Sequence, residues 1–171
     1  MMPRPIVLFV RGVDTFNGWV GKFAMYLFFA LAAVLLWSTI SRLLFGAPVN
    51  WALEMSQFIL SAYYLLGGAW SLQQGGHVRM DLFYSRLPPK RRAGIDAFTA
   101  LFVIFYLGVL IWGGISSTNY AITYGQKNYS AWSPVLWPIK VIMTFGICLM
   151  LLQFIANFFK DVAEARGKPI V

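Results

Sequence analysis

Four long apolar runs constrain this chain more than any other feature of its sequence. They cover residues 22–43, 51–74, 97–122 and 135–159. A helix needs roughly 20 mostly apolar residues to cross the hydrocarbon core of a bilayer. The runs lack the strict alternation of a strand, and backbone groups in lipid must be satisfied within their own segment. The sequence therefore predicts an all-α membrane protein with four transmembrane helices in one domain, residues 1–171.

The composition supports lipid as the solvent of this chain. It is 59% hydrophobic and only 12% charged, whereas soluble domains carry about 25% charged residues. The net charge of +8 would suggest nucleic acid in a soluble protein. Here the basic residues cluster at the ends of the apolar runs, so we expect no nucleic-acid partner. With one cysteine and one histidine, the chain has no internal disulfide and no Cys/His metal motif.

The flanking charges predict the orientation of the helices. Basic residues are frequent before the first run, between the second and third runs and after the fourth run, but Arg42 and Lys127 stand alone in the other two connections. By the positive-inside rule, both termini and the middle loop lie in the cytoplasm. The apolar stretch 6–10 is too short for a signal peptide, so we expect the first long helix to remain in a multi-pass protein of the bacterial inner membrane.

Two smaller helices are also predicted. In residues 5–21, apolar side chains recur at helical spacing, which is typical of an amphipathic helix lying on the cytoplasmic surface. A disordered tail is the alternative for this segment. Between the second and third runs, Asp81 begins "DLFYSRL", a short interfacial helix that Pro88 and Pro89 then end.

The polar residues near the runs offer little chemistry. A catalytic His77 would need a nucleophile or a second base, and a haem between membrane helices would usually need two histidines. The glycines beside His77 favour a polar turn, although a pH-sensing role stays open. Glu54 and Lys140 lie near the external ends of their helices, where they would snorkel, pair with each other or contact a partner. A role of these two residues in carrying a coupling ion is the sharper alternative.

Three stretches resemble one family of membrane subunits. The stretch "GGHVRMDLF", with "RLPPKRR" after it, is similar to the family's Gly/His-x-Arg-x-Asp and Leu-Pro-basic pattern at the end of the second span. Upstream, Arg42 precedes a Trp-x-x-Glu opening formed by Trp51 and Glu54. The stretch "SAWSPVLWPIKVIMTFGICLMLLQ" carries a Ser and Trp-Pro before the fourth span and a late Leu-Gln. From about Val13 to Phe159, the chain resembles the small DctQ-type subunit of tripartite ATP-independent periplasmic (TRAP) transporters.

The resemblance implies a role without catalysis and without a cofactor. It implies a scaffold for a large membrane subunit that moves substrate and sodium by an elevator-like motion, with substrate delivered by a periplasmic binding protein. The "LWPIK" and "SLQQGGHVRMD" wording implies small organic acids as cargo. The residues expected to make structural contacts with a partner or with phospholipids are Arg42, Trp51, Glu54, His77, Arg79, Asp81, Arg86 and Lys140.

Two other functions remain open at this level. The chain could anchor a redox complex with His77 as a haem ligand, or it could transport a solute by itself through Glu54. Neither an interrupted helix pair of the kind found at transport sites nor an enzyme motif occurs in the sequence. These absences favour an accessory subunit.

Overall fold

The computed structural model describes residues 4–75 and 89–165, and almost all of its regular structure is helical. Its helices are α1 (Arg4–Phe45), α2 (Ala52–Gln73), α4 (Pro89–Thr123) and α5 (Trp137–Ala165). α1 packs on α2, α2 on α5 and α5 on α4, while α1 also touches α5. The two central helices are therefore α2 and α5, and α1 and α4 flank them.

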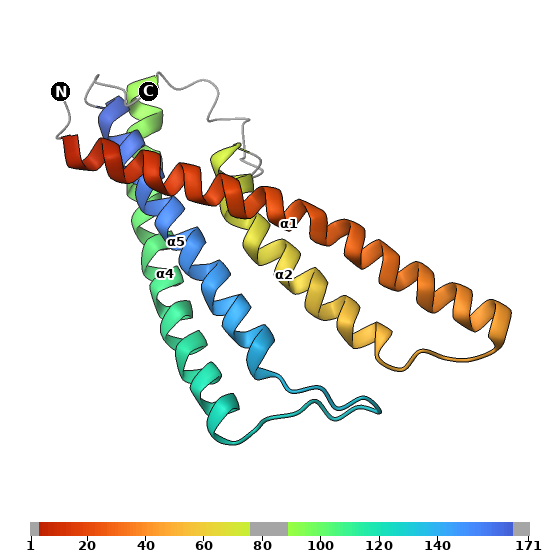
Figure 1. The fold of residues 1–171 in the computed structure, drawn as a ribbon. Coiled ribbons are helices and arrows are strands. Elements are labelled where there is room, and N and C mark those ends of the chain that lie inside the picture. Colours follow the sequence, from red (N-terminus) through yellow and green to blue (C-terminus); the bar gives the residue numbers. More distant parts are fainter. Residues whose placement is uncertain (1–3, 76–88, 166–171) are drawn as a thin grey trace.

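The described helices form two hairpins, α1–α2 and α4–α5, that approach at one end and diverge toward the other (Figure 1). The start of α1, the end of α2, the start of α4 and the end of α5 lie at the closed end. The α1–α2 and α4–α5 connections lie at the open end. The first part of α1 crosses over α5 at the closed end, where the two helices are in contact.

Residues 4–21 are helical, so the disordered-tail alternative is wrong. The predicted amphipathic segment is not a separate helix, however, because α1 runs without a break from Arg4 to Phe45. No proline follows Pro5 within α1, and nothing else in this stretch stops a helix. At about 1.5 Å per residue, α1 is about 63 Å long. That length is about twice the thickness of the hydrocarbon core.

Three helices are long and apolar enough to cross a membrane: α1, the Gly94–Thr123 part of α4 and the Trp137–Glu164 part of α5. Among the residues that the structure describes, α2 does not meet this criterion. Three of the four predicted spans are therefore supported. The polar residues of α2 lower its hydropathy, but several are covered by neighbouring helices. Glu54 and Ser56 are buried in its first two turns.

The other boundaries differ modestly from the sequence prediction. α4 begins at Pro89 rather than at residue 97, and α5 continues past residue 159 to Ala165. Both extensions are polar or charged and add helix beyond the apolar run. The predicted interfacial helix "DLFYSRL" falls outside the described residues.

Small residues allow the central helices to approach closely. The core cluster consists of Ala24, Ala62, Leu66, Ala69 and Leu149. A methyl group added at Gly21 would collide with the Trp70 side chain, and one added at Gly146 would lie 2.9 Å from the backbone carbon of Leu65. Gly21 thus lets α1 pack on α2, and Gly146 lets α5 pack on α2.

The connection between α4 and α5 is an ordered hairpin. Gly125 adopts φ 55° and ends α4 in a left-handed turn, in which its N–H bonds to the Ile122 carbonyl and the next N–H, from Gln126, bonds to the Ala121 carbonyl. The Leu136 N–H then donates to the Gln126 carbonyl at 3.0 Å. This hairpin brings Gln126 back toward the first turn of α5.

Candidate functional site

Four of the eight residues singled out in the sequence can be placed in the fold. Arg42 is exposed in the last turn of α1, and Trp51 is exposed at the N-cap of α2, where its side chain makes no capping hydrogen bond. Both lie near the α1–α2 connection, at the open end of the molecule. His77, Arg79, Asp81 and Arg86 lie outside the described residues.

Lys140 is bound by α4 and its following loop. Its Nζ donates to Ser117 Oγ at 2.9 Å and to Gln126 Oε1 at 2.8 Å, with a longer bond of 3.4 Å to the Ser117 carbonyl. An ammonium group has three donors, and these three acceptors match that number. Lys140 therefore joins the two ends of the α4–α5 hairpin.

Glu54 does not pair with Lys140, the possibility left open by the sequence. Glu54 is only 6% exposed on α2, and its Oε2 has no hydrogen-bond partner among the residues that the structure describes. The acceptors bound by Lys140 come from α4 and the hairpin instead. The two residues that the sequence placed near one face thus belong to separate environments.

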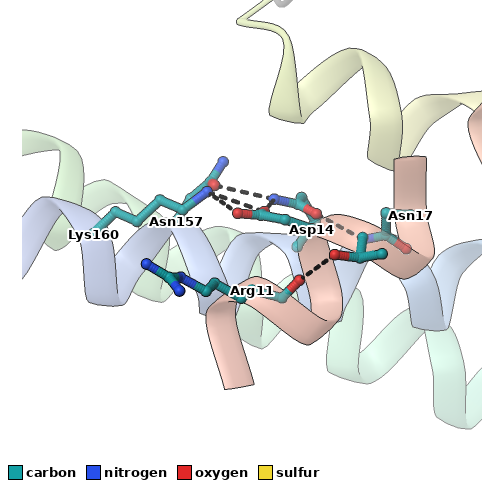
Figure 2. A network of polar contacts seen from close by, with 7 residues as sticks. Arg11, Asp14, Asn17, Asn157 and Lys160 are labelled. Atoms are coloured by element: carbon teal, nitrogen blue, oxygen red, sulfur yellow. Dashed lines mark hydrogen bonds and ion pairs between the residues drawn. The ribbon is translucent and has the colours of Figure 1, made fainter. Parts of the chain in front are cut away.

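The principal polar feature of the fold was not singled out in the sequence. We call it the Asp14–Lys160 network, and it consists of Asp14, Asn17, Gln153, Asn157 and Lys160. Lys160 Nζ lies 2.7 Å from Asp14 Oδ2 and 3.0 Å from Asp14 Oδ1. Figure 2 shows this ion pair joining the first part of α1 to the end of α5. Both side chains are partly exposed.

The network continues inward through amides. Gln153 Nε2 donates to Asp14 Oδ1 at 2.9 Å and to Asn157 Oδ1 at 3.2 Å, while Asn17 Nδ2 donates to Gln153 Oε1 at 2.7 Å. Asn17 and Gln153 are 1% and 0% exposed. Buried amides are costly unless hydrogen-bonded. These bonds therefore fix how α1 lies across α5.

The sequence held only partial signals for this network. Lys160 is one of the basic residues after the fourth apolar run, and Gln153 is the glutamine of the late Leu-Gln pair. Gln153, Asn157 and Lys160 are spaced four and three residues apart, which places them on one face of a helix. Their partner Asp14 is 139 positions from Gln153 in the sequence. No local sequence pattern reveals that the two residues are in contact.

Outside the network, the surface is broadly apolar. On α4, Phe105 is 74% exposed and Trp112 is 77% exposed, and on α1 Phe29 and Trp37 are exposed as well. An open groove of about 510 Å³ runs between α4 and α5 beside Trp112, Asn119 and Phe145. A soluble monomer rarely exposes so much contiguous apolar surface, which marks contact with lipid or with another protein.

The structure holds no cluster suited to metal binding within its described ranges. No group of three or more His, Cys, Asp or Glu side chains is close enough to hold an ion there. The polar side chains of the Asp14–Lys160 network bond largely to one another, and those around Lys140 do the same. Their arrangement is that of packing contacts between helices.

The comparisons with known proteins agree with this architecture. The family model of the DctQ component of tripartite ATP-independent periplasmic transporters matches residues 31–164. The sialic acid TRAP transporter permease protein SiaT of Haemophilus influenzae (strain 86-028NP) is 26% identical over 110 residues. That alignment covers 64% of this chain but only 17% of the relative's length.

The matched range begins within α1 and takes in α2, α4 and nearly all of α5. The resemblance of the chain to the DctQ-type subunit is therefore confirmed at the level of the family. The chain belongs to the DctQ component family of the tripartite ATP-independent periplasmic transporters.

Proposed function

We propose that this chain is the small, non-catalytic membrane subunit of a sodium-coupled TRAP importer of small organic acids. It acts as a stationary scaffold for a large subunit that carries the solute, and a periplasmic binding protein supplies that solute. The observation that carries the proposal is the division of the molecule into an internally bonded polar interior and a wide apolar exterior. Such a division suits support of a neighbour in the bilayer.

The interior supports a scaffold role more than a solute path. A carrier site needs polar groups that are free to bind and release a ligand. Gln153 and Lys140 instead bond to neighbouring helices or loops through several atoms. Three buried side-chain oxygens have no hydrogen-bond partner among the residues that the structure describes: Asn17 Oδ1, Glu54 Oε2 and Gln73 Oε1. Glu54 supplies the single carboxylate among them, which is a small basis for autonomous transport.

The proposed topology has four spans with both termini in the cytoplasm. α2 is 22 residues long, so a straight α2 extends for about 33 Å and reaches across the core of a bilayer. Its polar residues are compatible with that position because α2 packs between α1 and α5. The start of α1, the start of α4 and the end of α5 lie at the closed end and contain most of the lysine and arginine residues that the structure describes. The positive-inside rule puts that end in the cytoplasm.

Small organic acids are proposed as cargo. Sialic acid, named for the relative from Haemophilus influenzae, is itself a carboxylic acid. Contacts with the cargo would lie in the large subunit and the binding protein. The eight residues Arg42, Trp51, Glu54, His77, Arg79, Asp81, Arg86 and Lys140 are proposed as packing, partner or lipid contacts.

Co-purification with the large subunit tests the scaffold role. The two chains are expressed together, with an affinity tag on the small subunit alone, and are extracted in mild detergent. A stable complex at a fixed ratio is expected. Recovery of the tagged chain without the large subunit, although both are present in the membrane, would contradict the proposal.

A visible absorption spectrum of the same preparation tests the redox alternative. A haem-binding anchor would show a Soret band that disappears in His77→Ala. The scaffold proposal predicts no such band in the purified complex.

A further inference from the structure

The first turns of α1 present three kinds of surface along one helix. One face packs on the bundle through Val10, Asn17, Gly21 and Ala24, all of them buried. We call residues 4–22 the α1 arm. The opposite side of the arm is exposed, and its composition differs from that of the apolar span that follows.

A line of positive charge follows the exposed side of the arm. Arg4, Arg11 and Lys22 are separated by seven and eleven residues, and both spacings return to nearly the same line of an α-helix. All three side chains are exposed, and none has an ion-pair partner among the residues that the structure describes. In Figure 2, no dashed line joins the Arg11 guanidinium to the Asp14–Lys160 network.

The acidic residue that would neutralise this line is already engaged. Asp14 is the single acid of α1, and Lys160 holds both of its carboxylate oxygens. The three cations therefore act on their surroundings without an acid beside them on the same helix. Anionic groups in the surroundings of the bundle can therefore approach these three side chains.

An exposed apolar strip lies beside the cations. Leu8 is exposed, Phe16 is about half exposed and Trp19 is 78% exposed. A shallow groove of about 540 Å³ runs along this strip and is lined by Leu8, Arg11, Gly12, Thr15, Phe16 and Trp19. A tryptophan beside arginine and lysine is the combination found where helices meet the lipid headgroup region.

We propose that the α1 arm is a binding site for anionic phospholipid. The guanidinium and ammonium groups bind lipid phosphate, and Leu8, Phe16 and Trp19 enter the boundary between headgroups and acyl chains. The length of α1 supports such a position, because the helix has more residues than a direct crossing of the bilayer uses. The ion pair of Asp14 with Lys160 positions the arm so that its packed face meets the bundle and its cationic line meets lipid.

This site rests on the proposed membrane topology but not on any transport role. Each cation near an anionic surface is worth roughly 1 kcal/mol, or about a fivefold change in binding. Three cations in one line thus produce a clear preference for an anionic lipid over a zwitterionic one.

Quenching of tryptophan fluorescence by brominated lipid measures this preference. The full chain is reconstituted in two kinds of vesicle, each containing the same fractions of phosphatidylglycerol and phosphatidylcholine. In one kind the phosphatidylglycerol carries acyl-chain bromine, and in the other an equal amount of phosphatidylcholine carries it. The contribution of Trp19 is obtained by subtracting the signal of Trp19→Phe.

The brominated phosphatidylglycerol is expected to quench Trp19 more strongly. Arg11→Gln should lower the selectivity about fivefold, and Arg4→Gln, Arg11→Gln and Lys22→Gln together should make the two lipids nearly equal. Lys127→Gln, which removes an exposed cation at the open end of the bundle, is the matched control and should keep full selectivity.

Equal quenching by the two brominated lipids in the unmodified chain would overturn the proposal, as would full selectivity in the triple variant. Both lipids are present in both leaflets, so the result does not depend on which way the chain inserts. The large subunit is absent from the assay. Failure here therefore leaves the scaffold role to be decided by co-purification and by solute uptake with the large subunit.

Discussion

Lys160 Nζ lies 2.7 Å from Asp14 Oδ2, although the two residues are 146 positions apart in the chain. This ion pair ties the first turns of α1 to the last turns of α5. Together with the amides of Asn17 and Gln153, it sets the crossing of the two helices at the closed end of the bundle. Asp14 is also the single acidic residue of α1, and its carboxylate is paired with Lys160. The exposed line of Arg4, Arg11 and Lys22 therefore has no acid on the same helix to neutralise it.

Removal of either charge of this pair is expected to destabilise the bundle. Asp14→Asn and Lys160→Gln should each lower the free energy of unfolding by about 1–2 kcal/mol, because a charge-assisted hydrogen bond is lost. Since the residues are in contact, the double variant should lose less than the sum of the single losses. Equilibrium unfolding in mixed micelles, followed by circular dichroism, measures all three. Strict additivity would show that the pair is not formed.

The buried amide pair gives a second test. Gln153→Leu removes the acceptor of Asn17 and one donor to Asp14, so it should cost about 2–3 kcal/mol as buried polar groups lose partners. Asn17→Leu added to it should restore part of that loss, because both partners are then apolar. The same unfolding assay checks this. A double variant less stable than Gln153→Leu alone would contradict the assigned bond.

Close packing of α1 on α2 depends on the missing side chain of Gly21. Gly21→Ala should destabilise the chain by about 1–3 kcal/mol, because the added methyl group collides with Trp70. Gly12→Ala lies on the same helix and meets nothing within 4 Å, so it should be neutral or slightly stabilising. Thermal unfolding of the two variants in detergent separates packing from helix propensity. Similar melting temperatures for both variants would exclude the close approach.

Lys140 is expected to act within the α4–α5 hairpin and not through Glu54. Lys140→Met should cost about 1–2 kcal/mol, since its bonds to Ser117 and Gln126 are lost. Combined with Glu54→Gln, its effect should be additive to within about 0.5 kcal/mol. A coupling energy well above that, measured by unfolding of the single and double variants, would indicate that the two residues pair after all.

The sequence was most informative where the pattern is local. Long apolar runs predicted helices at 22–43, 51–74, 97–122 and 135–159, and each range overlaps a helix of the structure. The ends were harder to predict, because α4 and α5 extend beyond their apolar runs into polar and charged residues. A polar stretch such as residues 160–165 has no apolar signal, yet it is helical and Lys160 is anchored to α1.

The polar interior could not be predicted from the sequence for a related reason. Asp14 and Gln153 are single polar residues in separate segments, and only the fold brings them within 2.9 Å. Glu54 and Lys140 show the same limit from the other side. Their similar depth in the predicted spans left a pair open, but packing directs Lys140 to the hairpin. The depth of a residue along a helix can be read from the local sequence. The helix that its side chain contacts depends on how the helices pack.

Solute uptake into proteoliposomes tests the scaffold role most directly. The small subunit is reconstituted alone and also together with the large subunit, with binding protein, a radiolabelled carboxylate such as sialic acid and an inward sodium gradient supplied in both cases. The scaffold account predicts uptake only when both membrane subunits are present. Sodium-dependent uptake by this chain alone would contradict it.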